Sequence, residues 1–199
     1  MRAVGRVMSQ DEETGSSERG EPGAPASRLL EEHAAVMGRV AMALLGDAAH
    51  VERVLEHVAR EVGAKGRAPE GAASPAASGS APTKEQSSAA ALVWLLGLVR
   101  AASATQLSKL PLRTRLGGAE AAPVTERMGS KEAVAARASL AALKPTEREA
   151  VVLSLVGGLD TAGVAAACNV DVATIEARIA RGLEQLLLEG ADGEAGGAR

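Results

Sequence analysis

The segment between Leu143 and Leu188 has the pattern of two short helices, a tight turn and a longer amphipathic helix. Asn169 suits the turn, because asparagine tolerates the left-handed backbone conformation. Apolar residues recur at helical spacing in the first part of the segment, at Leu143, Val151, Val152, Leu155 and Val156. The expected elements are, in order, a helix opened by Pro145 and its N-cap Thr146, a break at Gly157-Gly158, a helix over 161–168, a turn over 169–171 and a helix over 172–188. This order predicts a helix-turn-helix unit, which in DNA-binding proteins places its second helix in the major groove.

Trp94 is the only aromatic residue in a chain of 199, so the cores must consist of leucine, valine and alanine. Such cores suit helices, whereas sheets are enriched in aromatic and β-branched residues. The expected fold is therefore all-α, with two small helical domains joined by a flexible linker.

Further helices are expected upstream of the helix-turn-helix unit. Ser27 is the expected N-cap of a helix that ends at Gly46-Asp47. Other helices are expected over about 48–62, 88–107 and 130–143, with Pro111 stopping the second of these three. The 48–62 helix carries an apolar face that predicts a core contact, made of Val51, Val54, Leu55, Val58 and Val62.

Segments rich in glycine, proline, serine and alanine divide the chain. They lack an apolar period and cannot bury enough surface to offset the entropy of ordering. The predicted organisation is a disordered N-terminal segment 1–26, a first domain 27–116 with a flexible insertion at 63–88, a linker 117–129, a second domain 130–189 and a disordered tail 190–199.

Three motifs occur in an order that resembles a known family. The residues that carry the resemblance are Leu44–Asp47 with Val51–Val58, then Trp94–Arg100, and then Leu143-x-Pro145-x-x-Arg148-Glu149 with Val151–Leu153, Val164-Ala165, Asn169-Val170, Thr174-Ile175, Arg178 and Arg181. Together they resemble the small RNA polymerase sigma factors of the extracytoplasmic-function type, and the chain is identified as a divergent member.

This resemblance implies a three-helix domain like sigma region 2 and a helix-turn-helix domain like sigma region 4. It implies core RNA polymerase and promoter DNA as partners, and an anti-sigma factor as a further partner. It implies no cofactor and no bound metal.

The resemblance assigns DNA contact to Thr174, Glu176, Arg178 and Arg181 in the last helix. Arg178 and Arg181 are three residues apart on one face, from which arginines reach phosphates or guanine edges. Small sigma factors usually carry lysine where Glu176 stands, and a carboxylate there repels phosphate. Gly163 stands at a glutamate position and weakens its helix by up to ~1 kcal/mol relative to alanine. A solvated charged face is the alternative interpretation.

A basic cluster, Lys109, Arg113 and Arg115, follows the helix that contains Trp94. It is a candidate phosphate contact, and a solvated cationic linker is the alternative. Base capture during promoter melting commonly uses aromatic stacking, yet the matching segment 63–88 contains no aromatic residue. Trp94 is predicted to lie in the core.

The resemblance assigns polymerase binding to Glu52, Leu55 and Glu56. The two glutamates are four residues apart and share a helix face that can meet a basic surface. Two acidic positions of the family's motif are occupied here by Arg53 and His57. Nearby arginines can also pair with the glutamates, in which case the stripe is an ordinary solvated face.

Other function classes have little support in the sequence. The net charge of −3 means that DNA binding must rest on local patches. Cys168, the single cysteine, is predicted to be a small core residue, and His33, His50 and His57 lack the partners of a metal site. No signal peptide is recognised, and the apolar run 89–99 is shorter than the ~20 residues that span a bilayer. We expect a cytoplasmic protein that does not insert into membranes and is not an enzyme.

The preferred function is to bind core RNA polymerase and direct it to promoters. The alternative is a degenerate sigma paralogue that binds polymerase or an anti-sigma-like regulator without opening DNA. Glu176 and the missing aromatic residues favour this alternative. A one-component helix-turn-helix regulator fits less well, because the chain has no candidate ligand-binding domain and the motif around Trp94 stays unexplained.

Overall fold

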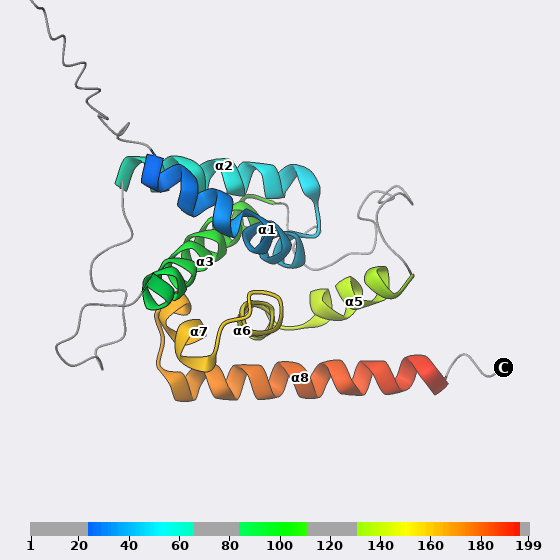
Figure 1. The fold of residues 1–199 in the computed structure, drawn as a ribbon. Helices are drawn as coiled ribbons and strands as arrows, with labels where there is room; N and C mark the ends of the chain where they lie inside the picture. Colours follow the sequence, from blue (N-terminus) through cyan, green and yellow to red (C-terminus); the bar gives the residue numbers. More distant parts are fainter. Residues whose placement is uncertain (1–23, 66–83, 111–130, 196–199) are drawn as a thin grey trace, which may run out of the picture.

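The computed structural model describes residues 24–65, 84–110 and 131–195. Within these ranges every regular element is an α-helix, as the sequence predicted. The helices are α1 (Ala24–Leu45), α2 (Ala48–Lys65), α3 (Lys84–Lys109), α5 (Lys131–Ala142), α6 (Pro145–Leu155), α7 (Thr161–Cys168) and α8 (Val172–Ala195). They form two helical units, α1–α3 and α5–α8 (Figure 1).

The first unit is a three-helix bundle in which each helix packs against the other two. The predicted valine stripe of α2 is confirmed, because Val51, Val54, Val58 and Val62 are buried, whereas Leu55 is half-buried at its edge. The remaining core side chains come from α1 and α3, and include Met37, Val40, Leu44, Leu95, Leu96 and Val99.

The turn between α1 and α2 explains the Leu-Gly-Asp motif. Gly46 has a φ of +71°, a conformation that glycine adopts without a Cβ penalty. Asp47 then caps α2, since its Oδ1 accepts a hydrogen bond of 3.0 Å from the backbone N–H of His50. This hydrogen bond and the contact with the His50 ring hold the pKa of Asp47 below its ordinary value.

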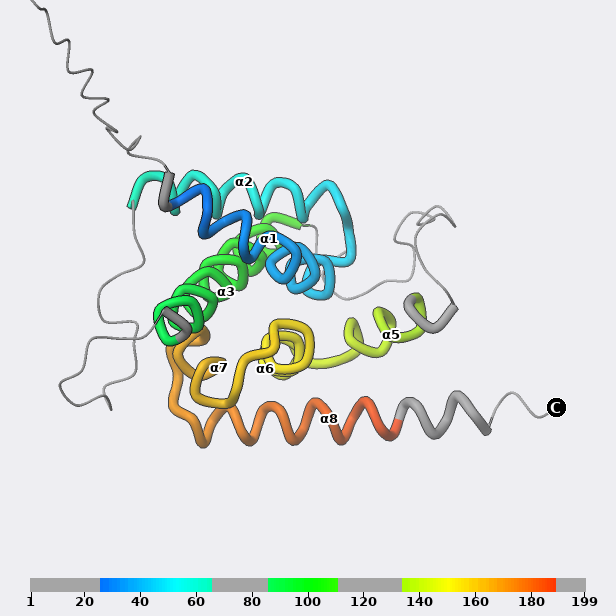
Figure 2. The backbone as a smooth tube through the Cα atoms, viewed as in Figure 1, coloured from blue at the N-terminus to red at the C-terminus, as the bar shows by residue number. Residues whose placement is uncertain are grey.

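The second unit is built around α6. Helix α8 packs along α6 and also contacts α7, on the side of these helices away from α1 and α2 (Figures 1 and 2). A Cβ placed on Gly182 of α8 would lie 2.7 Å from Cγ2 of Val151, so this glycine permits the close approach of α8 to α6. The core side chains of this unit are Leu143, Val151, Val152, Leu153, Val164 and Ile175.

The two units pack directly on each other through a seam between α3 and α7, with a smaller contact between α1 and α6. Three glycines line this seam or its border: a Cβ on Gly97 would lie 3.3 Å from the Ala167 carbonyl oxygen, one on Gly163 3.3 Å from Val93, and one on Gly157 2.9 Å from Leu96. Gly163 is therefore a site of close helix approach, where a larger side chain such as glutamate would not fit in this packing.

An ion pair crosses between the units as well. Arg100 Nη1 of α3 lies 3.4 Å from Glu149 Oε2 of α6, and both side chains are more than half buried. The two units thus share one hydrophobic core, with a partly buried ion pair beside it.

Several helix ends differ from the sequence predictions. Helix α1 begins at Ala24, so Ser27 lies inside it, and α6 begins at Pro145 after the N-cap Lys144, so Thr146 is not the cap. Residues 63–65 extend α2, residues 84–88 begin α3, and α8 continues through 190–195. Long helices propagate past the composition change because each added residue closes another backbone hydrogen bond. The predicted linker 117–129 and the middle of the predicted insertion, 66–83, lie outside the described residues.

One residue of the apolar pattern between Leu143 and Val156 faces solvent. Leu155, in the last turn of α6, is 65% exposed, whereas Leu153 is fully buried. Near the end of α6, its contacts with α7, α8 and α1 bury a different face of the helix from the one that the apolar period of the sequence indicated.

Helix α3 between Gln86 and Lys109 is long and apolar enough to cross a membrane by length and composition. The sequence analysis considered only the shorter run 89–99. In the fold this helix packs against α1, α2 and α7, and Leu95, Leu96 and Val99 are fully buried there. It is the central core helix of the described structure.

Candidate nucleic-acid interface

The helix-turn-helix geometry arises from three short polar residues. Asp160 caps α7, because its Oδ1 accepts a 2.7 Å hydrogen bond from the Gly163 N–H. Asn169 ends α7 in the left-handed conformation (φ 55°, ψ 49°), and its N–H bonds the carbonyls of Ala165 and Ala166. The predicted role of Asn169 in the turn is confirmed, and this turn directs the chain into α8.

Asp171 caps α8. Its carboxylate accepts hydrogen bonds from the Thr174 N–H at 2.7 Å and from the Thr174 hydroxyl at 2.6 Å. The hydroxyl bond and then the backbone bond lower the pKa of Asp171, because both stabilise the charged carboxylate. Thr174, which the sequence analysis assigned to DNA, thus donates its hydroxyl proton within the protein.

Helix α8 has a buried face and an exposed face. Ile175 is fully buried and Gly182 is buried, whereas the opposite face carries three exposed alanines, Ala173, Ala177 and Ala180. At 100° per residue, Glu176 and Arg181 border this alanine face on opposite sides. The exposed face therefore presents small apolar side chains bordered by two opposite charges. It carries few groups that can form hydrogen bonds with base edges.

The two arginines of α8 differ in exposure. Arg181 is exposed, and its Nε donates a 3.0 Å hydrogen bond to the Ala177 carbonyl oxygen. Arg178 is half-buried, and its charge acts on the thiol of Cys168 in α7. Arg181 can therefore present its guanidinium to a ligand beside the alanine face, whereas the half-buried Arg178 is less accessible to such a ligand.

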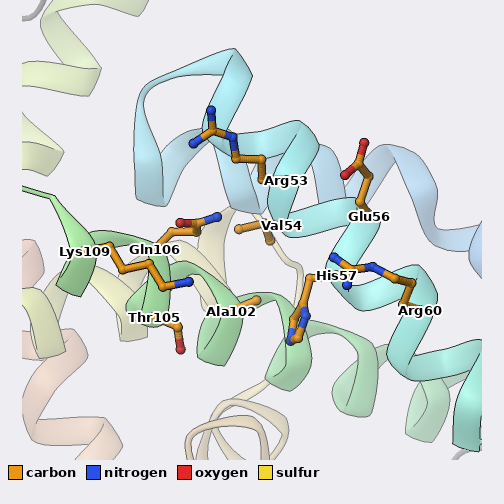
Figure 3. Close-up of a pocket in the computed structure, with 9 residues that line it drawn as sticks. All are labelled: Arg53, Val54, Glu56, His57, Arg60, Ala102, Thr105, Gln106 and Lys109. Atoms are coloured by element: carbon orange, nitrogen blue, oxygen red, sulfur yellow. The ribbon is translucent and has the colours of Figure 1, made fainter.

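The predicted basic cluster after α3 is described in part. Lys109 is exposed in the last turn of α3, where it faces a groove shared with α2 (Figure 3). Arg113 and Arg115 lie outside the described residues. The sequence analysis did not predict that Arg53, His57 and Arg60 of α2 line the same groove, since contacts between distant helices leave no local pattern.

The candidate polymerase-binding residues lie on α2. Glu52 and Glu56 are exposed, and Leu55 between them is half-buried against the core. Within the described ranges neither glutamate forms an ion pair. Their carboxylates therefore stay available for a basic partner.

The sequence analysis placed two further residues, Trp94 and Cys168, in the core. Trp94 is half-buried against the core, and Cys168 is buried in α7 next to the seam. Burial raises the pKa of the Cys168 thiol, because the thiolate loses its hydration. Among the described residues, no group of three or more histidine, cysteine or acidic side chains is arranged to hold a metal ion.

Comparisons with known proteins agree with this geometry. Residues 133–186, which include α6, α7 and most of α8, match the family profile described as "Sigma-70, region 4". Among curated proteins no sequence matches the chain.

Among solved structures, the fold is similar to that of CnrH in complex with the cytosolic domain of CnrY. The identity is 18% and the TM-score 0.57, and the likeness covers 87% of this chain and 92% of that chain. At this identity the likeness supports a shared fold alone, and that shared fold includes both helical units. Residues 133–186 are thus similar to sigma region 4, and the likeness to CnrH shows a shared all-helical fold, both as the resemblance to small sigma factors of the extracytoplasmic-function type predicts.

Proposed function

We propose that this protein binds core RNA polymerase and directs it to promoter DNA. The observation that carries the proposal is the helix-turn-helix unit within the region 4 match, whose α8 lies at the edge of the molecule with one face exposed (Figure 1). Such a helix is free to enter a major groove without rearrangement of its own unit. The proposed role needs no catalysis by the chain itself, and we propose a cytoplasmic location.

The proposed DNA contacts use the charges that border the alanine face. Arg181 and Arg178 serve as phosphate or guanine ligands, while Glu176 weakens binding on the other border. Thr174 contributes through its hydrogen bond to Asp171, which holds the first turn of α8. Lys109 at the end of α3 and the following Arg113 and Arg115 supply further phosphate contacts.

The proposed polymerase contact uses the acidic stripe of α2. Glu52 and Glu56 meet a basic surface of the partner, and the half-buried Leu55 between them offers a small apolar contact. Complementary charges of this kind mainly set the association rate and the specificity.

A second candidate function is a sigma paralogue that binds a protein partner without opening DNA. The alanine-rich exposed face of α8 and the exposed Glu176 favour it, because neither provides base readout. CnrH has been solved in complex with the cytosolic domain of CnrY. By analogy we propose that an anti-sigma segment binds this chain.

Pull-down with core polymerase followed by run-off transcription separates the two functions. Retention of the full chain with transcripts supports promoter direction, and retention without transcripts supports the paralogue. Glu52→Lys with Glu56→Lys should abolish retention. Glu31→Lys with Glu32→Lys is the matched control, since it makes the same charge change on exposed positions of α1. Equal loss in both variants would show that retention reflects net charge and not the α2 stripe.

A further inference from the structure

Helix α7 of the second unit packs against α3 of the first unit at very short range. A Cβ placed on Gly97 of α3 would lie 3.3 Å from the carbonyl oxygen of Ala167, and a Cβ on Gly163 of α7 would lie 3.3 Å from Cγ2 of Val93. A side chain at either position would therefore have to displace a neighbour. The two glycines thus allow the approach of α3 and α7 that closes the seam between the units (Figure 1).

Charge also matches between the two units. Arg100 Nη1 of α3 lies 3.4 Å from Glu149 Oε2 of α6, and the two side chains are 25% and 21% exposed. Removing either partner would leave a partly buried charge without its counter-charge, which is costly. The pair therefore favours the arrangement of the units in which these two side chains meet.

Gly163 is an unfavourable residue for α7 itself. Asp160 is the N-cap of this helix, and Gly163 occupies the third helical position. A glutamate at that position can complete a capping box with the N-cap residue, and the resemblance to small sigma factors places a glutamate there. Glycine forgoes this cap and lowers the helix propensity of α7. The chain thus departs from the family pattern at a residue whose visible structural gain is the close contact with α3.

The closed seam places the proposed contact surfaces for polymerase and promoter on opposite sides of the chain. Glu52 and Glu56 are exposed on α2, whereas α8 lies on the side away from α1 and α2 (Figures 1 and 2). Helices α3 and α7 lie between them, because α2 packs on α3, α3 on α7 and α7 on α8. Three such steps of about 8–10 Å separate the axes of α2 and α8 by up to about 30 Å. A polymerase bound at α2 therefore meets one side of the closed chain, and a duplex bound at α8 meets the other.

We infer that the seam between α3 and α7 is an autoinhibitory contact that keeps the free chain closed without an added regulator. The inference rests on the proposed function, because it concerns how polymerase and promoter engage the same chain. Separation of the units frees α8 to follow a duplex that polymerase holds. The apparent affinity for the two partners together is therefore reduced in proportion to the fraction of open chains.

A disulfide across the seam tests whether closure blocks promoter use. The short distance between position 163 and the side chain of Val93 allows Val93→Cys and Gly163→Cys to place two Cβ atoms near the ~3.5–4.5 Å separation of a disulfide. Both substitutions are made in the full chain with Cys168→Ala, because Cys168 is buried in α7 next to the seam. Retention by core polymerase and run-off transcripts are measured before and after reduction. The Cys168→Ala chain under the same two conditions is the control.

The oxidised chain should still be retained through Glu52 and Glu56 but should yield no transcripts above background. Reduction should restore the transcripts to the level of the control. Titration of free thiols verifies that the disulfide has formed. Equal transcript yields from the oxidised and the reduced chain would overturn the inference.

The substitution Gly163→Glu tests closure from the opposite direction. Glutamate suits the third position of α7, so α7 should stay helical while the seam is overpacked. Overpacking of this kind should shift the equilibrium about 5- to 150-fold toward the open chain. Gly38→Glu is the matched control, because it makes the same change in α1, where a Cβ meets nothing within 4 Å. Circular dichroism verifies that both variants keep the helical fold.

Distances between two spin labels report closure directly. Labels at Ala59→Cys on α2 and Ala180→Cys on α8, both exposed positions, should give one narrow distance distribution in the Cys168→Ala chain. Gly163→Glu should lengthen and broaden this distribution and raise the transcript yield at limiting chain, whereas Gly38→Glu should do neither. An unchanged distribution in Gly163→Glu would overturn the inference.

The two kinds of measurement keep the proposals apart. A chain that shows the narrow distribution and loses it in Gly163→Glu, but yields no transcripts in any form, contradicts promoter direction and supports the closed state. Transcripts that do not depend on the disulfide contradict autoinhibition alone.

Discussion

Gly182 of α8 offers a direct test of how the candidate DNA-binding helix is held. This glycine is buried against α6, where an added Cβ would lie 2.7 Å from Cγ2 of Val151 and 3.6 Å from Cβ of Glu147. Val151 is 1% exposed, and its β-branched side chain has little rotamer freedom in a helix. The substitution Gly182→Ala therefore forces α8 away from α6.

The expected effect combines two opposing contributions. Alanine in place of glycine favours a helix interior by up to ~1 kcal/mol. Overpacking a filled core costs about 1–3 kcal/mol. The free energy of unfolding should therefore fall by about 0–2 kcal/mol in Gly182→Ala.

Gly38 supplies the matched control. It lies in the interior of α1, and a Cβ placed there meets nothing within 4 Å. Gly38→Ala should accordingly raise the free energy of unfolding by about 0.5–1 kcal/mol, so the two substitutions should differ by about 1–3 kcal/mol. Urea denaturation followed by far-UV circular dichroism measures both variants on the full chain.

A double-mutant cycle identifies the cause. In a Val151→Ala background the clashing methyl is absent, so Gly182→Ala should become stabilising, as Gly38→Ala is. The coupling energy between positions 151 and 182 should be about 1–3 kcal/mol. Equal effects of the Gly182 and Gly38 substitutions, or a coupling near zero, would refute the close packing of α8 on α6.

Glu176→Lys should strengthen binding to promoter duplex and steepen the slope of log affinity against log salt by about 0.9 per added phosphate contact, whereas Arg181→Ala should weaken binding. Fluorescence anisotropy at two salt concentrations measures both effects. If neither substitution changes the affinity, the DNA contact lies elsewhere. Asp171→Ala should lower the melting temperature near neutral pH. Because the folded pKa of Asp171 lies below its ordinary value of 3.8, the stabilisation is present above that pH and is lost as the pH falls through the lowered pKa, so thermal melts of wild type and variant should converge in acid. The buried Cys168, whose pKa is raised, should react with a thiol reagent far more slowly in the folded chain than in urea, and equal rates would contradict its burial.

The local pattern of the sequence was sufficient for the helical class and for the helix-turn-helix unit. Asn169 adopts the left-handed conformation that its side chain tolerates, and α7 has the predicted bounds. The valine stripe of α2 faces the core as its period indicated. These features depend on residues within a turn or two of each other, so adjacent sequence determines them.

The caps were only partly predictable. Thr146 and Ser27 are good N-cap residues by type, yet α6 and α1 begin before them. A helix start depends on which backbone N–H groups the tertiary fold leaves exposed as well as on the residue type. Asp160 and Asp171, which do cap helices, were not predicted as caps, although aspartate is a favoured N-cap residue.

The relation between the two helical units was decided by tertiary structure. Gly97 and Gly163 are 66 residues apart in the sequence, yet both permit the close approach of α3 and α7. The sequence alone presented Gly163 as a weakness in its helix. The fold explains it as the position where a side chain larger than hydrogen would collide with Val93 or Asp160.

The basic groove has the same origin. Arg53 and Lys109 belong to different helices, and only the packing of α2 on α3 brings their charges to one surface. A helical period specifies which face of one helix a residue occupies, but it carries no information about which face of another helix lies opposite. The sequence by itself therefore determined the helices, their apolar faces and the turn into α8, while the seam between the units and the surfaces open to partners were set by long-range packing.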